Sequence, residues 1–277
     1  MKRLKTILIL CITLCVITSC KKEVDMTLMQ QTLLENTDIR KIKVGDGWEV
    51  NVIADSSTFV ELEYSAYLEE SLKMQMTGTC LEIGFAESTY PETNSVFRAT
   101  VHLSQLEKID AQEAANILVS GTFSGPQLTV ELNGASICKS LAFTGNQCEI
   151  RVDDASKLLD FHFEGASCRA TFNNASQFNG QIHASDFLDI EANDASLFVN
   201  KGGTTAKAQL ELLGNSLLNI VETQVEEMEV ALSENSEATV WVTSLLKGSL
   251  KETSTLYYKG DAQIDLDCSE DSRYIPL

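Results

Sequence analysis

The middle of the chain carries carboxylate and basic side chains that could cleave a polysaccharide if they met in one groove. The candidates are Asp153, Asp154, Glu164, Asp186, Asp189 and Asp194, with the bases Arg151, Lys157 and Arg169. The two catalytic carboxyl groups of a glycosidase lie about 5–10 Å apart. Asp154 and Asp194 would satisfy this limit, at roughly 9.6 Å, if the chain between them formed two stacked coils. The chemistry therefore depends on how the chain repeats.

Other kinds of site have little support in the sequence. His162 and His183 could be neighbours on consecutive coils, but neither they nor His102 have the spacing of a metal site or a catalytic triad. Asp153 and Asp154 are not part of a dense acidic loop of the kind that binds calcium. We therefore assign no catalytic residue, no metal ligand and no cofactor.

The stretch that must position these side chains repeats at a constant interval of about 20 residues, within the range of known repeat architectures. Its four-residue motif, such as Asp153-Asp154-Ala155-Ser156, ends on a serine in every copy. The six serines are Ser136, Ser156, Ser176, Ser196, Ser216 and Ser236. A fixed period of this length is typical of a solenoid, in which each repeat stacks on the next.

The segments before each motif alternate apolar and polar residues, which predicts strands with one buried face. Phe123, Phe143 and Phe163 also recur at the interval of the motif, so we expect them to stack inside the core. A coil of about 20 residues is too short for a strand plus a full crossover helix. The sequence therefore predicts an all-β fold, a single-stranded right-handed parallel β-helix, or β-solenoid, with about 20 residues per coil.

The repeated motif has a structural explanation that requires no ligand. Glycine, asparagine and aspartate enter left-handed turn conformations at low cost, and a serine hydroxyl can satisfy backbone groups that a bend leaves free. We expect the chain to turn at Gly134, Asp154, Asn174, Asp194 and Gly214, with Ser136, Ser156, Ser176, Ser196 and Ser216 supporting the corners. Ligand-binding residues are not assigned.

The N-terminus has the features of a bacterial lipoprotein. Three positive charges precede an apolar run, which ends in Ile17-Thr18-Ser19-Cys20. This pattern predicts a signal peptide over 1–19, lipidation of Cys20, a tether over 20–36 and a β-solenoid domain over 37–277. The lipid would hold the protein on a membrane, and the sequence does not distinguish a periplasmic from a surface-exposed position.

Charge and cysteine content restrict the partners. The chain has a formal charge of −19, and so acidic a surface argues against nucleic acid as a partner. Five cysteines lie beyond the predicted lipidation site, and they are Cys80, Cys138, Cys148, Cys168 and Cys268. Their number and spacing do not suggest a disulfide framework, and free buried thiols are favoured. Cys148 and Cys168 would stack on adjacent coils, so a disulfide between them stays open as an alternative.

Three features together resemble the putative auto-transporter adhesin family with a head GIN domain. They are the hairpin pattern from Ile39 to Val52, the Ala-Ser corners from Gly134 onward, and the closing segment Thr255 to Gly260. The resemblance covers about Thr37 to Leu277. It implies a β-helical fold and an adhesive role outside the cytoplasm.

We therefore expect a non-enzymatic lipoprotein of the cell envelope, anchored in the outer membrane, that binds an extracellular glycan or a partner protein. Parallel β-helices also include polysaccharide lyases and hydrolases, so an enzyme is the first alternative. A purely structural envelope protein is the second.

Overall fold

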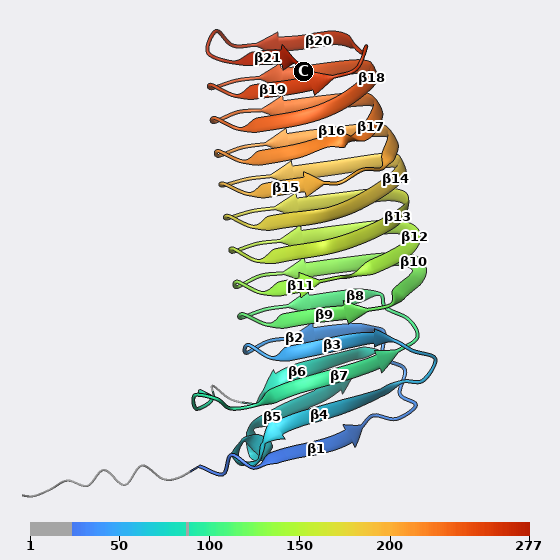
Figure 1. Cartoon of the computed structure of the whole chain (residues 1–277), viewed down its shortest axis with the longest axis vertical. Coiled ribbons are helices and arrows are strands. Elements are labelled where there is room, and N and C mark those ends of the chain that lie inside the picture. The colour runs from blue at the N-terminus through green and yellow to red at the C-terminus, as the bar shows by residue number, and fades with distance from the viewer. Residues whose placement is uncertain (1–23, 87–88) are drawn as a thin grey trace, which may run out of the picture.

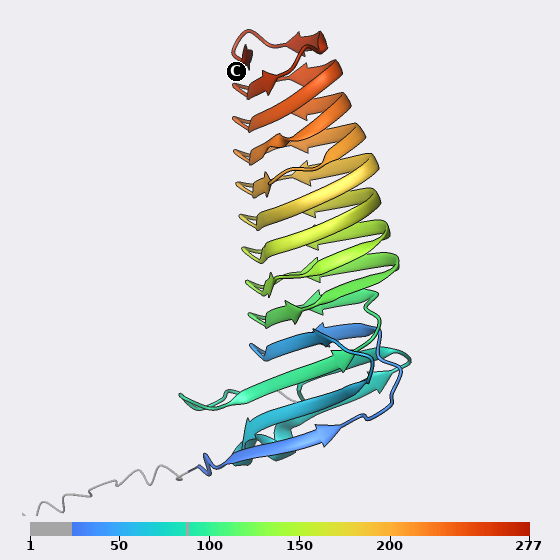
Figure 2. The same ribbon diagram turned by 45° about the vertical axis from the view of Figure 1, so that its right-hand side comes forward.

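The computed structural model describes residues 24–86 and 89–277, and it is a tall stack of coils (Figures 1 and 2). Its 21 strands form one continuous sheet that winds around a single core. Phe123, Phe143 and Phe163 are register partners on parallel neighbouring strands, which places one repeat directly on the next. The predicted β-solenoid, with its predicted coil length, is confirmed.

Each coil has two flat sides that meet at a sharp corner formed by the repeated motif. The strands that lead into the corners are β8 (Lys108–Ala111), β10 (Thr122–Leu132), β12 (Ala142–Val152), β16 (Thr204–Leu212) and β20 (Gln263–Cys268). The strands that follow the corners are β9 (Asn116–Ser120), β11 (Ile137–Lys139), β15 (Leu197–Asn200), β19 (Thr255–Lys259) and β21 (Arg273–Pro276). Four longer strands run from one side around to the other, and they are β13 (Lys157–Phe172), β14 (Gln177–Ala192), β17 (Leu217–Leu232) and β18 (Glu237–Leu250).

Aligned apolar columns fill the interior, as the spacing of the repeat predicts. The rings of Phe143 and Phe163 stack with centroids 6.4 Å apart and an interplanar angle of 12°. Phe178 and Phe198 stack at 4.4 Å on the other side of the coil. These rings are fully buried, so each coil adds apolar area to a continuous core.

The N-terminal part of the stack is built differently from the repeats. Its elements are β1 (Leu28–Leu33), β2 (Lys41–Val44), β3 (Glu49–Ala54), β4 (Phe59–Ser65), the 3₁₀ helix η1 (Ala66–Ser71), β5 (Leu72–Thr77), β6 (Cys80–Phe85) and β7 (Phe97–Leu103). Strands β1, β4, β7 and β3 lie side by side, and β1–β4 and β4–β7 pair antiparallel. Strand β3 then pairs in parallel with β9, the first post-corner strand of the solenoid.

Two local expectations differ from this structure. Residues 28–33 fall in the predicted tether but form β1, so the folded body begins before residue 37. The apolar spacing from Tyr67 to Met76 allows a short helix, yet only Ala66–Ser71 is helical, and the rest is β5, paired antiparallel with β6. In both segments, pairing with a distant strand determines the conformation.

The last coils are slightly shorter than the others, but the serine column continues. Ser254 follows Ser236 more closely in the sequence than the earlier corner serines follow one another. It is fully buried and donates a hydrogen bond to the Leu232 carbonyl oxygen. Register shifts between β17 and β18 on the opposite side of the coil absorb the shortening. Strands β20 and β21 form a last coil after Ser254, within the predicted β-solenoid domain.

Within the described ranges, no helix is long and apolar enough to cross a membrane.

Candidate functional site

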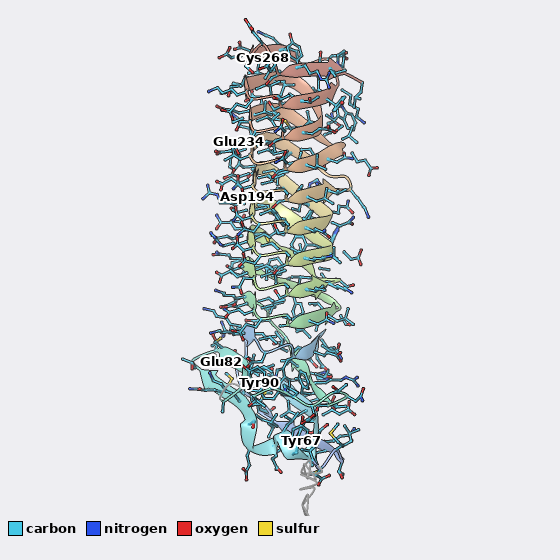
Figure 3. The ribbon with its side chains drawn as sticks, turned by 90° about the vertical axis from the view of Figure 1, so that its left-hand side faces the viewer. Tyr67, Glu82, Tyr90, Asp194, Glu234 and Cys268 are labelled. Atoms are coloured by element: carbon cyan, nitrogen blue, oxygen red, sulfur yellow. The ribbon has the colours of Figure 1, made fainter. Side chains whose placement is uncertain are left out.

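The corners use left-handed backbone at two successive residues. The first residue of each pair has a φ of 51–64° and is Gly134, Asp154, Asn174, Asp194 or Gly214, or, in the first and last corners, Glu113, Glu234 or Glu252. The second also has positive φ, including five alanines at Ala114, Ala135, Ala155, Ala175 and Ala195. Asp194 and Glu234 mark this column on the corner side of the molecule in Figure 3.

The corner serines lie inside the stack and bind one another and the backbone. Ser136, Ser156, Ser176, Ser196 and Ser216 are all buried. The hydroxyls of Ser196 and Ser216 donate to the carbonyl oxygens three residues before them, at 2.6 and 2.7 Å. Ser176 and Ser196 are hydrogen-bonded to each other at 3.2 Å. These hydroxyls are therefore not available to a ligand.

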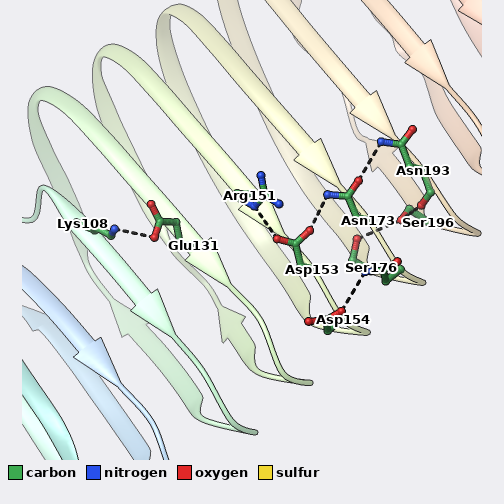
Figure 4. Close-up of polar contacts among 10 residues, drawn as sticks. Lys108, Glu131, Arg151, Asp153, Asp154, Asn173, Ser176, Asn193 and Ser196 are labelled. Atoms are coloured by element: carbon green, nitrogen blue, oxygen red, sulfur yellow. Dashed lines mark hydrogen bonds and ion pairs between the residues drawn. The ribbon is translucent and has the colours of Figure 1, made fainter.

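A ladder of polar side chains runs beside the corners (Figure 4). Arg151 contacts Asp153 at 2.7 Å, and Asn173 donates to the same carboxylate at 2.6 Å. Asn193 in turn donates to Asn173 at 2.9 Å. The ladder ends there, because the next coil has Leu213 at this position. Side chains of one coil bind those of the next, and Asn193 Oδ1 at the end of the ladder is buried without a hydrogen-bond partner among the described residues. The ladder is a structural array.

The carboxylates and bases singled out from the sequence do not converge on one groove. Arg169 and Asp189 form an ion pair at 2.8 Å, separate from the pair of Arg151 and Asp153. Asp154 accepts a hydrogen bond from Asn174, which lies between it and Asp194 in the column. Among the described residues, no group of three or more histidine, cysteine or carboxylate side chains could hold a metal ion.

The histidines on consecutive coils are also apart in register. His162 lies beside Gln181, and His183 lies beside Glu164. An irregularity between Leu159 and Phe161, next to Asp160 with a φ of 52°, displaces the register there. His162 and His183 are therefore diagonal neighbours on adjacent coils, two residues apart in register, and not direct partners.

All five cysteines of the described chain are free thiols. Cys148 and Cys168 are register partners on adjacent coils, and both are buried. Leu128 and Leu188, their partners on the neighbouring coils, are buried too, as is Cys138. Burial raises the pKa of Cys138 to about 12 and the pKa of Cys148 well above its ordinary value, in the second case with a further contribution from Cys168. These thiols behave as core residues.

The two sides of the solenoid differ strongly in charge. We define the pre-corner face by the residues five and seven positions before each corner serine, from Ser136 to Ser254. Of these 14 outward positions, six are acids and three are bases, a net charge of −3.

The post-corner face consists of the residues one and three positions after the same serines. Its 14 positions include one acid and two bases, which are Glu237, Lys139 and Lys157, a net charge of +1. Six are apolar, and they are Ile137, Leu159, Leu197, Val199, Leu217 and Tyr257. Leu197 and Leu217 are adjacent in register and 37% and 48% exposed. This face therefore presents an apolar and amide surface on an otherwise acidic molecule.

The same outer surface continues onto the N-terminal strands, where it is hollowed. We call this hollow the base groove; its volume is about 470 Å³, and it lies over β1, β4, β7 and β3. The residues that line it are Gln30, Gln31, Thr32, Asn51, Glu61, Leu62, Glu63, Arg98, Ala99 and Thr100.

The strand register arranges the polar side chains of the base groove in two rows. The first row is Gln30, Glu63, Arg98 and Glu49. Arg98 Nε contacts Glu49 at 2.7 Å, Arg98 Nη1 contacts Glu63 at 3.4 Å, and Gln30 donates to Glu63 at 3.3 Å. The second row is Thr32, Glu61, Thr100 and Asn51.

An aromatic pair lies next to the second row, two residues farther along β4 and β7. The ring of His102 stacks on Phe59 with centroids 4.0 Å apart. His102 Nδ1 lies 3.1 Å from Asp55, whose carboxylate also accepts a hydrogen bond from the Ser57 amide. The Ser57 amide, followed by His102, lowers the pKa of Asp55. Sequence patterns gave no reason to group these residues, because only the pairing of β4 with β7 brings them together.

The sequence matches the family described as putative auto-transporter adhesin, head GIN domain, over residues 38–262. The chain belongs to this family. No curated protein matches it in sequence. The family assignment agrees with the resemblance expected from the Ala-Ser corners and the closing Tyr-containing turn.

Three solved structures of similar fold come from the genus Parabacteroides. A putative adhesin from Parabacteroides merdae has a TM-score of 0.66 and 12% identity, and the match covers 92% of this chain and 98% of that one. A putative lipid binding protein from Parabacteroides distasonis has a TM-score of 0.65 and 13% identity, with 90% and 96% covered. A putative adhesin from the same species has a TM-score of 0.55 and 16% identity, with 91% and 95% covered. At these identities, the likeness extends to the fold.

Proposed function

We propose that this head GIN family protein is a non-enzymatic adhesin of the cell envelope, held at the outer membrane by a lipid on Cys20, which lies outside the described residues. Its post-corner face binds an extracellular glycan or a partner protein. The contrast between the two faces is the observation that supports this role. A chain with a charge of −19 repels acidic surfaces, and its post-corner face is the side on which that repulsion is weakest.

Exposed aliphatic residues on this face favour contact with a partner. The side chains of Leu197 and Leu217 are exposed to solvent. A partner that covers them would bury apolar area, and this burial stabilises association. The face is flat and periodic, with coils about 4.8 Å apart. A repeated surface of this kind suits an extended polymer or a broad protein surface better than a small molecule.

Two variants in one strand test which face binds. Leu217→Glu and Ala231→Glu each add one acid to an exposed position of β17, the first on the post-corner face and the second on the pre-corner face. The purified mature chain is applied to immobilised neutral polysaccharides, acidic polysaccharides and extracellular matrix proteins. We expect binding that Leu217→Glu lowers at least tenfold and Ala231→Glu leaves within twofold. Equal binding by the two variants would exclude the post-corner face as the binding surface.

A polysaccharide-acting enzyme is the second candidate, because one feature favours it. Glu61 and Glu63 project from the same face of β4, two residues or about 7 Å apart, within the range that glycosidases use. However, the acid of such an enzyme is buried against apolar atoms, whereas the Glu61 side chain is 57% exposed and Glu63 is paired with Arg98. If the protein releases reducing or unsaturated ends from a bound polysaccharide, it is an enzyme and not an adhesin. If it binds none of the surfaces tested, a structural envelope protein is favoured.

A further inference from the structure

The base groove has the composition of a site for polyhydroxylated ligands. Planar amides, carboxylates, hydroxyls and a guanidinium group project from four adjacent strands into one hollow. Such groups can donate and accept pairs of hydrogen bonds to the neighbouring hydroxyls of a sugar. We propose that the base groove binds an uncharged saccharide segment of a glycan, a proposal that rests on the adhesive function and names its ligand.

The key side chains are held in place before any ligand arrives. Arg98 contacts both Glu49 and Glu63, and Glu63 also accepts a hydrogen bond from Gln30. Because these contacts restrict the row, a ligand bears less of the entropic cost of ordering it. In the second row, Thr32, Thr100 and Asn51 have no side-chain hydrogen bond to another described residue, so their polar atoms can serve a ligand.

Charge selects an uncharged ligand. Among the residues that line the groove, Glu61 and Glu63 outnumber Arg98, which gives a formal charge of −1, and Glu49 beside Arg98 adds a further acid at its edge. The negative charge of the groove and of the whole chain would repel uronic acids and sulfated sugars. A divalent cation is disfavoured, since Arg98 already neutralises Glu49 and Glu63.

The surroundings suit a chain rather than a single sugar. Phe59, stacked on His102, provides apolar surface next to the second row, where the ring of a sugar could pack. On the other side, β3 pairs with β9, so the surface of the groove continues without a break into the post-corner face. A polymer bound in the groove could therefore extend along the solenoid.

Matched double variants test the groove. Asn51 and Thr100 are register neighbours in the groove, whereas Thr144 and Asn146 are exposed residues of β12 that lie outside both the groove and the post-corner face. Asn51→Ala with Thr100→Ala removes groove hydrogen bonds, and Asn146→Ala with Thr144→Ala makes the same chemical change away from the proposed binding surfaces. Circular dichroism verifies that each variant is folded.

The probes are oligosaccharides of at least four units from neutral glucans, mannans and galactans, compared with uronate and sulfated oligosaccharides, in calorimetric titrations of the mature chain. We expect binding of a neutral member, reduced at least tenfold by the groove variant and less than twofold by its control. Equal losses in both variants, preference for acidic sugars, or no neutral sugar bound would overturn the groove proposal. If the groove variant still adheres to the surfaces described above, the adhesive function stands without the groove; if the wild-type chain adheres to none, the adhesive function itself fails.

Discussion

At the scale of single residues, each corner combines two left-handed positions with a buried serine. Glycine and asparagine occupy such positions at little cost, whereas alanine has a Cβ atom that disfavours them. The alanines at Ala135, Ala155, Ala175 and Ala195 therefore carry backbone strain, with φ values of 59–63°. The buried serine and the stacked corners above and below hold them there.

Replacing one of these alanines should relieve the strain. We expect Ala175→Gly to raise the free energy of unfolding by about 1 kcal/mol, because glycine has no Cβ atom at a φ of 60°. Ala170→Gly, in a buried strand position, should lower it. Urea unfolding monitored by circular dichroism measures both. A loss of stability in Ala175→Gly would show that packing of the methyl group outweighs the strain.

The buried thiols predict a loss of stability at alkaline pH. Burial raises the pKa of Cys138 to about 12, while an unfolded thiol ionises near 9. Above pH 9 the unfolded state therefore releases its proton first, and the free energy of unfolding falls by about 1.4 kcal/mol per pH unit for this group. Urea titrations at pH 8, 10 and 11 should show a steeper decline for the wild type than for Cys138→Ala. Parallel declines would mean that Cys138 does not contribute.

At the scale of elements, stability comes from columns that pass through successive strands. Phe143 and Phe163 stack face to face on β12 and β13, and both are fully buried. A charge in this column would have no partner and would cost several kcal/mol.

We expect Phe143→Asp to abolish cooperative unfolding, and Phe143→Leu, which keeps the side chain apolar, to retain it with a lower midpoint. Thermal unfolding with detection of the near-ultraviolet signal measures both. A cooperative transition in Phe143→Asp would refute the inward position of this ring.

A column of glycines sets the bend between the two sides of the coil. Gly125, Gly145 and Gly165 are register partners, and a Cβ atom on Gly165 would collide with the carbonyl oxygen of Gly145 and the ring of Phe163. We expect Gly165→Ala to lower the free energy of unfolding by at least roughly 2 kcal/mol, since neither backbone nor buried ring can move away. Ser167→Ala, two residues along the same strand, should change it by less than about 0.5 kcal/mol. Urea unfolding distinguishes the two, and a neutral Gly165→Ala would mean that the coils can separate locally.

At the scale of the whole molecule, the solenoid is a tall body with a groove near its N-terminal end and a low-charge face along one side. The proposed anchor at Cys20 would place the base groove near the membrane and the later coils farther out. This arrangement presents the whole post-corner face to a polymer outside the membrane.

The anchor gives a direct prediction. Cells grown with a radiolabelled fatty acid should label the wild-type protein and leave Cys20→Ala unlabelled, because only the cysteine at the predicted cleavage site receives lipid. Cys80→Ala, which changes a cysteine of the folded body, should keep its label. Persistent labelling of Cys20→Ala would overturn the anchor.

The sequence by itself determined the coil length, the corners and the core columns. These features are periodic, and a constant interval places Phe143 on Phe163 and Ser176 on Ser196 whatever lies between them. Only the tertiary structure decided where the period fails. The irregularity near Asp160 shifts the register so that His162 pairs with Gln181, and long-range antiparallel pairing turns residues 28–33 into β1. The base groove belongs to the same class, because Gln30, Glu63 and Arg98 come from three strands whose register depends on pairing between distant segments, which no local pattern encodes.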